Sequence, residues 1–238
     1  MKITNITKSF NKFSLCIDSL ELKPGLIHGL IGHNGCGKTT VMKIIAGLIE
    51  VCGGEIDYEG LTCRDITMAP RKPYFLHTSV YRNLIYPLTI RGIKPNKSMV
   101  DYYLEISGLK DKRKQYALSL SSGEQQKLSL VRALIFSPKL ILIDEALSNL
   151  DIESVDLFEK LFLERQKNEP ATWLVISHQL PHIQRLCSRV FFMYDGAIEA
   201  EGLTEDILLR PINPRLKKYL HHELINSKQE VHDEVFAC

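Results

Sequence analysis

Three short apolar runs stand out along the chain, and each one ends in a cluster of polar residues. The runs are Leu26–Ile31, Leu140–Ile143 and Thr172–Ile176. Apolar runs of this length without strict alternation predict parallel strands that are buried on both faces. The carboxyl ends of parallel strands form the ligand-binding edge of an open α/β sheet. We therefore expect the three polar clusters to converge on one ligand.

The remaining pattern alternates between strand-like and helix-like segments. Residues 2–7 and 13–22 are β-prone and partly alternating, which predicts antiparallel strands, and 55–58 and 66–69 are further strand candidates. A hairpin is expected around Asp195-Gly196. The expected helices cover residues 41–46, 79–88, 99–107, 152–167, 204–210 and about 214–226. A further long helix is expected to follow residues 121–124 and to end at about residue 136.

Strand signals become scarce after Pro70, which predicts a helical insertion of roughly 50 residues. We expect one domain at 1–225. Within it, 1–70 and 120–225 form an α/β core with an antiparallel β subdomain, and 71–119 form a helical subdomain. Residues 226–238 are expected to be a C-terminal tail.

The first apolar run leads into a glycine-rich segment of the pattern G-x-x-x-x-G-K-[ST], a phosphate-binding loop. Its residues are Gly32, His33, Asn34, Gly35, Cys36, Gly37, Lys38, Thr39 and Thr40. Glycines let the backbone curl so that successive N–H groups point at phosphate oxygens, and the following helix adds its positive N-terminal end. In such a loop Lys38 reaches the β- and γ-phosphates, and the Thr39 hydroxyl ligates Mg²⁺.

Composition narrows the class of protein. The chain has 238 residues, 45% of them hydrophobic, and a net charge of +2, which suits a folded α/β chain without the basic face of a nucleic-acid binder. No apolar run is long enough to span a membrane and the N-terminus is too polar for a secretory signal, so a soluble, cytosolic chain is expected.

The six cysteines follow neither a zinc-ligand nor a disulfide spacing. Cys36 differs from the others because it lies within the phosphate loop. A helix N-terminus could lower its pKa, so that a thiol reagent inactivates the protein and ATP protects it. The alternative is that Cys36 is only a small residue that the loop tolerates.

The second and third apolar runs end in residues suited to phosphate chemistry. Asp144 could hold Mg²⁺ and Glu145 could act as general base on a water, although Asp144-Glu145 could also simply cap the next helix. His178 could orient the attacking water, whereas a lone histidine after a strand is more often structural. Ser121-Ser122-Gly123-Glu124 fits both a capping box and an anion site at a helix N-terminus.

Together these motifs resemble the ATP-binding cassette (ABC) family over residues 1 to about 225. The resemblance rests on Gly32–Thr40, Leu120–Lys127, Leu140–Glu145, Ser148–Asp151 and Ile176–His178. It implies an α/β fold with a RecA-like P-loop NTPase core, an antiparallel β subdomain and a helical subdomain. It also implies an ATPase that uses ATP and Mg²⁺, in which two cassettes sandwich two ATP molecules.

The resemblance also implies individual roles. Phe10 corresponds to the aromatic residue that stacks on adenine, with Phe13 as the alternative, and His178 to the switch histidine. Ser121, Ser122 and Gly123 would contact the γ-phosphate bound to the opposite subunit. Asp151 would lie at the dimer seam.

The chain departs from the family pattern at three positions. Ser122 replaces a glycine and Glu124 replaces a glutamine in the signature motif. Arg71 stands where the family usually has a glutamine that contacts Mg²⁺. Because arginine cannot ligate a metal and could instead pair with phosphate or carboxylate, we hypothesise a slow ATPase with altered Mg²⁺ dependence.

The family resemblance implies partners as well. The expected assembly contains integral membrane permease subunits, a second ATPase subunit (a homodimer) and, in an importer, a solute-binding protein, at the cytoplasmic face of the membrane and without nucleic acid. Residues 72–84 resemble the equivalent stretch of tungstate- and other oxyanion-type importers, and permease docking is expected near 71–86. The alternatives are a catalytically weak, regulatory cassette and a non-transport ABC ATPase.

Overall fold

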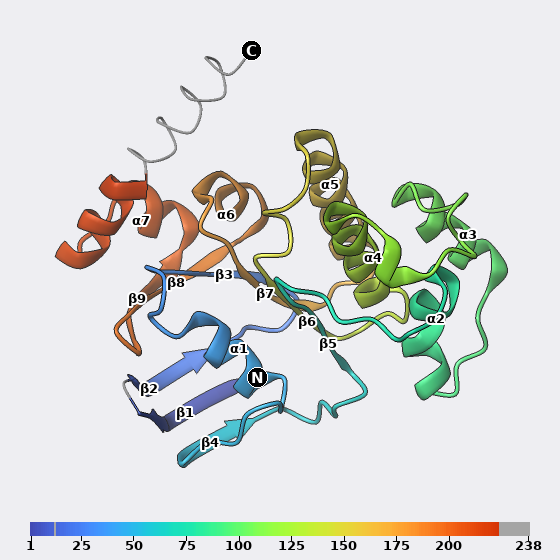
Figure 1. Ribbon diagram of the computed structural model, residues 1–238. Coiled ribbons are helices and arrows are strands. Elements are labelled where there is room, and N and C mark those ends of the chain that lie inside the picture. Colours follow the sequence, from blue (N-terminus) through green and yellow to red (C-terminus); the bar gives the residue numbers. More distant parts are fainter. Residues whose placement is uncertain (12, 224–238) are drawn as a thin grey trace. The chain divides into compact units, whose positions relative to one another are not determined.

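The computed structural model describes residues 1–11 and 13–223 (Figure 1). Its elements fall into two compact units. The first unit combines Met1–Gly60 with Thr172–Cys238, and the second is Leu61–Ala171. The segment 71–119, predicted as a helical subdomain, lies within the second unit, and its boundaries stay a prediction. The tail predicted at 226–238 lies outside the described residues.

An antiparallel sheet occupies the N-terminal part of the first unit. Strand β1 (Lys2–Phe10) lies between β2 (Phe13–Glu21) and β4 (Gly53–Asp57). The register places buried Ile3 opposite Leu20 and buried Ile6 opposite Ile17. The alternation of apolar and polar residues therefore gives this sheet one buried face.

The same unit contains a mainly parallel group of strands. Strand β3 (Ile27–Ile31) pairs in parallel with β7 (Thr172–Ile176) and β8 (Arg189–Tyr194), and β9 (Ala197–Leu203) adds an antiparallel edge. Every residue of β3 and β7 is buried, as the continuous apolar runs predict. The helices of this unit are α1 (Lys38–Ile45), α6 (Leu180–Leu186), α7 (Thr204–Leu209) and a helical stretch over residues 214–223.

The second unit contains one parallel strand pair and most of the longer helices. Strand β5 (Ile66–Ala69) pairs with β6 (Leu140–Asp144), with Ala69 opposite Ile143. The helices are α2 (Val80–Ile90), α3 (Lys97–Ile106), the short 3₁₀ helix η1 (Ala117–Ser119), α4 (Ser122–Leu134) and α5 (Ile152–Asn168). Side chains cap the N-termini of α2, α3, α4 and α5, namely Ser79, Asn96, Ser121 and Asp151.

Within residues 1–11 and 13–223, none of the helices combines the length and apolar character that crossing a membrane would require.

Candidate functional site

The phosphate loop connects β3 to α1, as the sequence pattern predicts. Gly37 occupies the N-cap position of α1 with φ 110°, and no side chain caps the helix. The first turn of a helix has backbone N–H groups without intrahelical partners, and these attract anions. The chain therefore presents a positively polarised helix end at the loop.

Two glycines of the loop meet close neighbours that exclude a side chain. A Cβ atom at Gly32 would lie 2.1 Å from the carbonyl oxygen of Met193. A Cβ atom at Gly37 would lie 2.7 Å from Cζ of Phe13. Packing against a backbone carbonyl thus requires glycine at position 32, and the positive φ values of 150° and 110° favour glycine at both positions.

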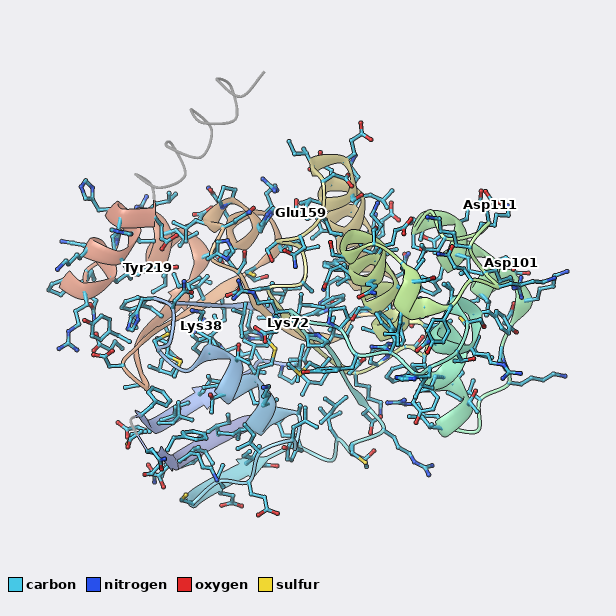
Figure 2. The ribbon with its side chains drawn as sticks, viewed as in Figure 1. Lys38, Lys72, Asp101, Asp111, Glu159 and Tyr219 are labelled. Carbon is cyan, nitrogen blue, oxygen red and sulfur yellow. The ribbon has the colours of Figure 1, made fainter. Side chains whose placement is uncertain are left out.

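Lys38, labelled in Figure 2, begins α1 at the end of this loop and is 5% exposed. Its ammonium group donates to the carbonyl oxygens of Gly32 at 2.6 Å and His33 at 3.0 Å. Thr39, the next residue, is exposed at the rim. A buried cation, a helix N-terminus and an adjacent hydroxyl form a cradle whose chemistry fits a phosphate group.

The turn between β8 and β9 supports the loop from the side. Nε2 of His33 lies 3.1 Å from Oδ1 of Asp195. The Gly196 N–H donates to the Cys36 carbonyl oxygen at 3.0 Å, and the Gly196 carbonyl accepts from the Cys16 N–H at 2.9 Å. The sequence identified Asp195-Gly196 only as a hairpin turn, because no local pattern marks a contact between segments some 160 residues apart.

Cys36 does not match the hypothesis of a reactive thiol. Its side chain is 1% exposed, and burial raises the pKa of its thiol, an effect that exceeds the opposing effect of Lys38. A buried, protonated thiol is a poor nucleophile. The interpretation as a small residue tolerated by the loop is the one that fits.

Phe10 and Phe13 form an aromatic pair at the end of the β1–β2 hairpin. Their ring centroids are 6.2 Å apart and their planes differ by 28°. Phe10 is 43% exposed and lines an open surface hollow with Lys8, Ser9 and Asn11. Since Phe13 reaches Gly37, the pair extends from the phosphate loop outward, and the exposed ring is that of Phe10.

Asp144 and Glu145 follow β6 in the second unit, and both are buried, at 3% and 8% exposure. Glu145 has φ 49°, a left-handed conformation that is uncommon for a residue with a side chain. Its carbonyl oxygen accepts from the hydroxyl of Ser148 at 2.7 Å, which holds this backbone. Strain of this kind is concentrated at functional sites.

Arg71 forms an ion pair with Glu145. The distance from Nη1 of Arg71 to Oε2 of Glu145 is 3.1 Å, and the arginine side chain is 61% exposed. Arg71 therefore pairs with a carboxylate, one of the two partners expected from the sequence. That partner is Glu145 of the same unit.

The N-terminus of α4 contains the predicted capping box. The Ser121 hydroxyl accepts from the Glu124 N–H at 3.3 Å, and the Glu124 carboxylate accepts from the Ser121 N–H at 3.0 Å. Ser122 begins the helix without a positive φ, so the residue replacing glycine is not strained. An ion pair with Lys112 is the main reason that the pKa of Glu124 is lowered. The lysine also balances the negative charge that Glu124 introduces in place of the neutral side chain of glutamine.

Asp151 is the N-cap residue of α5, and its side chain accepts hydrogen bonds from the first turn of that helix. Its carboxylate accepts from the Ser154 N–H at 2.8 Å and hydroxyl at 2.9 Å, and these bonds lower the pKa of Asp151. Nζ of Lys127 lies 3.6 Å from Oδ2 of Asp151.

His178 follows β7 in the first unit and is partly exposed. The proposed roles of Asp151 at a dimer seam and His178 beside phosphate remain predictions.

Comparison with known proteins agrees with these features. Residues 16–148 match the family model described as "ABC transporter". The tungstate uptake system ATP-binding protein TupC of Peptoclostridium acidaminophilum is 35% identical over 84% of this chain and 97% of that protein. The methionine import ATP-binding protein MetN 1 of Listeria monocytogenes is 30% identical over 94% of this chain and 72% of that protein.

A solved structure described as the ATP-binding subunit of an ABC transporter has the same fold. It superimposes with a TM-score of 0.81, at 22% identity, over 94% of this chain and 98% of that chain. The family model, the extended sequence similarity and the phosphate loop built around Lys38 lead to one conclusion. This chain belongs to the ABC transporter family and is one of its ATP-binding, ATP-hydrolysing subunits.

Proposed function

We propose that this ATPase powers uptake of an oxyanion through separate permease subunits at the cytoplasmic face of the membrane. The buried Lys38 cradle supports the energy-coupling half of this proposal. The similarity to a tungstate uptake subunit over nearly its whole length supports the substrate class. The test is uptake of labelled tungstate by vesicles containing the chain and its co-purified permease. Uptake of methionine but not tungstate would contradict the substrate class.

The proposed chemistry assigns one task to each group. Lys38 and the loop N–H groups bind the phosphates, Phe10 stacks on adenine, and the Thr39 hydroxyl and Asp144 carboxylate hold Mg²⁺. The metal would neutralise phosphate charge when bound. Glu145 accepts a proton from the attacking water and His178 orients that water.

A complete site is proposed to need a second copy of this chain, whose Ser121, Ser122 and Gly123 would contact the γ-phosphate. The exposed N-terminus of α4 supports this role, because a helix end with serine hydroxyls binds anions. The test is the molar mass of Glu145→Gln in solution with ATP. The expected result is an ATP-dependent dimer that is lost in Gly123→Trp, and a monomer at saturating ATP would contradict the proposal.

The permease is proposed to dock near residues 71–86. The wider segment 66–100 contains six lysine and arginine residues and no aspartate or glutamate, although the whole chain is nearly balanced. Tyr74 is 80% exposed in the same segment. This combination fits a partner segment that presents acidic and apolar side chains. We expect Tyr74→Asp to abolish co-purification of the permease while ATP turnover is retained, and Tyr102→Asp, at 48% exposure on α3, to have no effect.

A solute-binding protein outside the membrane completes the proposed importer, because a transported oxyanion must be delivered to the permease. The test is to co-express the importer components and to compare ATP turnover with and without the solute-binding protein, which should stimulate turnover.

A further inference from the structure

The register of one strand pair brings Arg71 beside Glu145. Strands β5 and β6 run in parallel with Ala69 opposite Ile143. Arg71 lies two residues beyond Ala69, and Glu145 lies two residues beyond Ile143. Since parallel strands advance together, the two side chains emerge at the same edge of the pair. The 3.1 Å ion pair is thus a consequence of the sheet register rather than of a chance surface conformation.

The backbones on both sides of this ion pair are held in place. The amide of Gln126, which is 1% exposed, donates to the carbonyl oxygen of Pro70 at 3.4 Å. The carbonyl of Glu145 accepts from the Ser148 hydroxyl at 2.7 Å. These contacts fix the backbone at Pro70, which precedes Arg71, and at Glu145 itself. The arginine side chain that joins them is 61% exposed.

An ion pair is unfavourable for a carboxylate that must act as a general base. The guanidinium engages one carboxylate oxygen at 3.1 Å, so that oxygen is not free to accept a proton from the attacking water. A general base must lie within hydrogen-bond reach of the water whose proton it accepts, so a carboxylate held by an arginine is poorly placed for this task. Within the pair, the arginine side chain is 61% exposed and the glutamate side chain is 8% exposed.

We propose that Arg71 is a positioning residue that restrains the Glu145 carboxylate and keeps ATP turnover of the isolated chain low. This inference rests on the proposed role of Glu145 as general base. Arg71 acts through Glu145 and does not itself touch the reacting atoms.

The test compares steady-state ATP turnover of the full chain with that of Arg71→Gln and Arg71→Lys. Arg71→Gln should raise kcat about two- to fivefold with unchanged KM for ATP, because partly exposed ion pairs are modest in strength. Its half-maximal Mg²⁺ concentration should fall, since a positive charge leaves the neighbourhood of Asp144. Arg71→Lys, which keeps the charge, should remain close to the wild type.

The matched control is Lys139→Gln, which removes an ion pair of 3.2 Å to Asp65 from a side chain that is 69% exposed. It should leave both kcat and the Mg²⁺ requirement unchanged. An equal rise in kcat in this control would indicate a general effect of lost charge and would overturn the inference. So would an Arg71→Gln variant with unchanged or lower kcat.

Variants at Glu145 separate this inference from the proposed function. In a Glu145→Gln background, Arg71→Gln should no longer change turnover. If Glu145→Gln keeps wild-type turnover, the proposed role of Glu145 is wrong whatever Arg71 does. If Glu145→Gln abolishes turnover and Arg71→Gln leaves it unchanged, only the restraint by Arg71 is wrong. Melting temperatures of all variants identify any loss of folding.

Discussion

The backbone N–H of Gly196 donates to the carbonyl oxygen of Cys36 over 3.0 Å and ties the phosphate loop to the β8–β9 turn. Gly196 also accepts from the Cys16 N–H of β2 at 2.9 Å. One residue of a hairpin turn thus connects the loop, the antiparallel sheet and the parallel strands of the first unit. The geometry of the phosphate loop therefore depends on a residue far from it in sequence.

Gly196→Ala is predicted to destabilise the fold strongly. Gly196 has φ +85°, and a Cβ atom there would lie 2.1 Å from the carbonyl oxygen of Ser14. Strain and backbone displacement together should lower the free energy of unfolding by about 2–4 kcal/mol. Gly60→Ala is the matched control, because Gly60 has φ +83° with open space around it and should cost about 1 kcal/mol. Urea denaturation of both variants measures the difference, and equal losses would refute the role of the close contact.

Lys38→Met should weaken nucleotide binding. Removing the ammonium takes a buried cation out of the phosphate cradle, and charged hydrogen bonds of this kind correspond to about a ten- to hundredfold change in affinity. Titration with a fluorescent ATP analogue measures the dissociation constant. Lys43→Met, at an exposed position of α1, is the control and should bind as the wild type does. Wild-type affinity in Lys38→Met would be inconsistent with the assigned cradle.

Acidification is predicted to lower the free energy of unfolding because His28 is buried. It is buried in β3, its Nε2 accepts from the Lys23 N–H at 3.0 Å, and burial lowers its pKa from 6.5 to about 4. As pH falls below 6.5 the unfolded chain takes up a proton that the folded protein takes up only near pH 4. The free energy of unfolding should therefore fall by about 2 kcal/mol from pH 7.5 to pH 5 through this group.

Urea denaturation at these two pH values measures that effect. His28→Gln lacks the titrating group, so its stability should depend less on pH even if it is lower throughout. The same pH dependence in the variant and the wild type would assign the effect to other residues.

Cysteine labelling should leave the phosphate loop intact. Cys16, Cys52 and Cys63 are exposed, whereas Cys36 and Cys187 are buried. Brief treatment of the folded protein with iodoacetamide should modify Cys16, Cys52 and Cys63 before the two buried thiols of the described residues, and it should preserve ATP binding. Mass spectrometry of peptides gives the extent of labelling at each site. Rapid modification of Cys36 with loss of ATP binding would restore the reactive-thiol hypothesis.

Strands were predictable wherever apolar residues were continuous. The runs at 26–31, 140–143 and 172–176 correspond to β3, β6 and β7, because full burial leaves little choice of residue type. Helix α6 was missed, since seven residues span only two turns and give no clear periodicity. Helix α1 begins at Lys38, whereas the sequence pattern predicted a start at Val41. The first turn consists of polar motif residues, which give no apolar periodicity to recognise.

The candidate site was predictable where chemistry is local in sequence. The phosphate loop and the capping box of α4 depend on neighbouring residues and could be read from spacing. The support of His33 by Asp195 and the pairing of Arg71 with Glu145 depend on tertiary contacts. The second of these becomes predictable only once the β5–β6 register is known.

We propose Glu145 as the general base of an Mg²⁺-dependent ATPase. The most direct measurement is phosphate release by wild type and Glu145→Gln at saturating Mg·ATP, together with their affinities for ATP. Loss of a general base should lower kcat about 100-fold or more while ATP binding is retained. Turnover by Glu145→Gln at the wild-type rate would contradict the account.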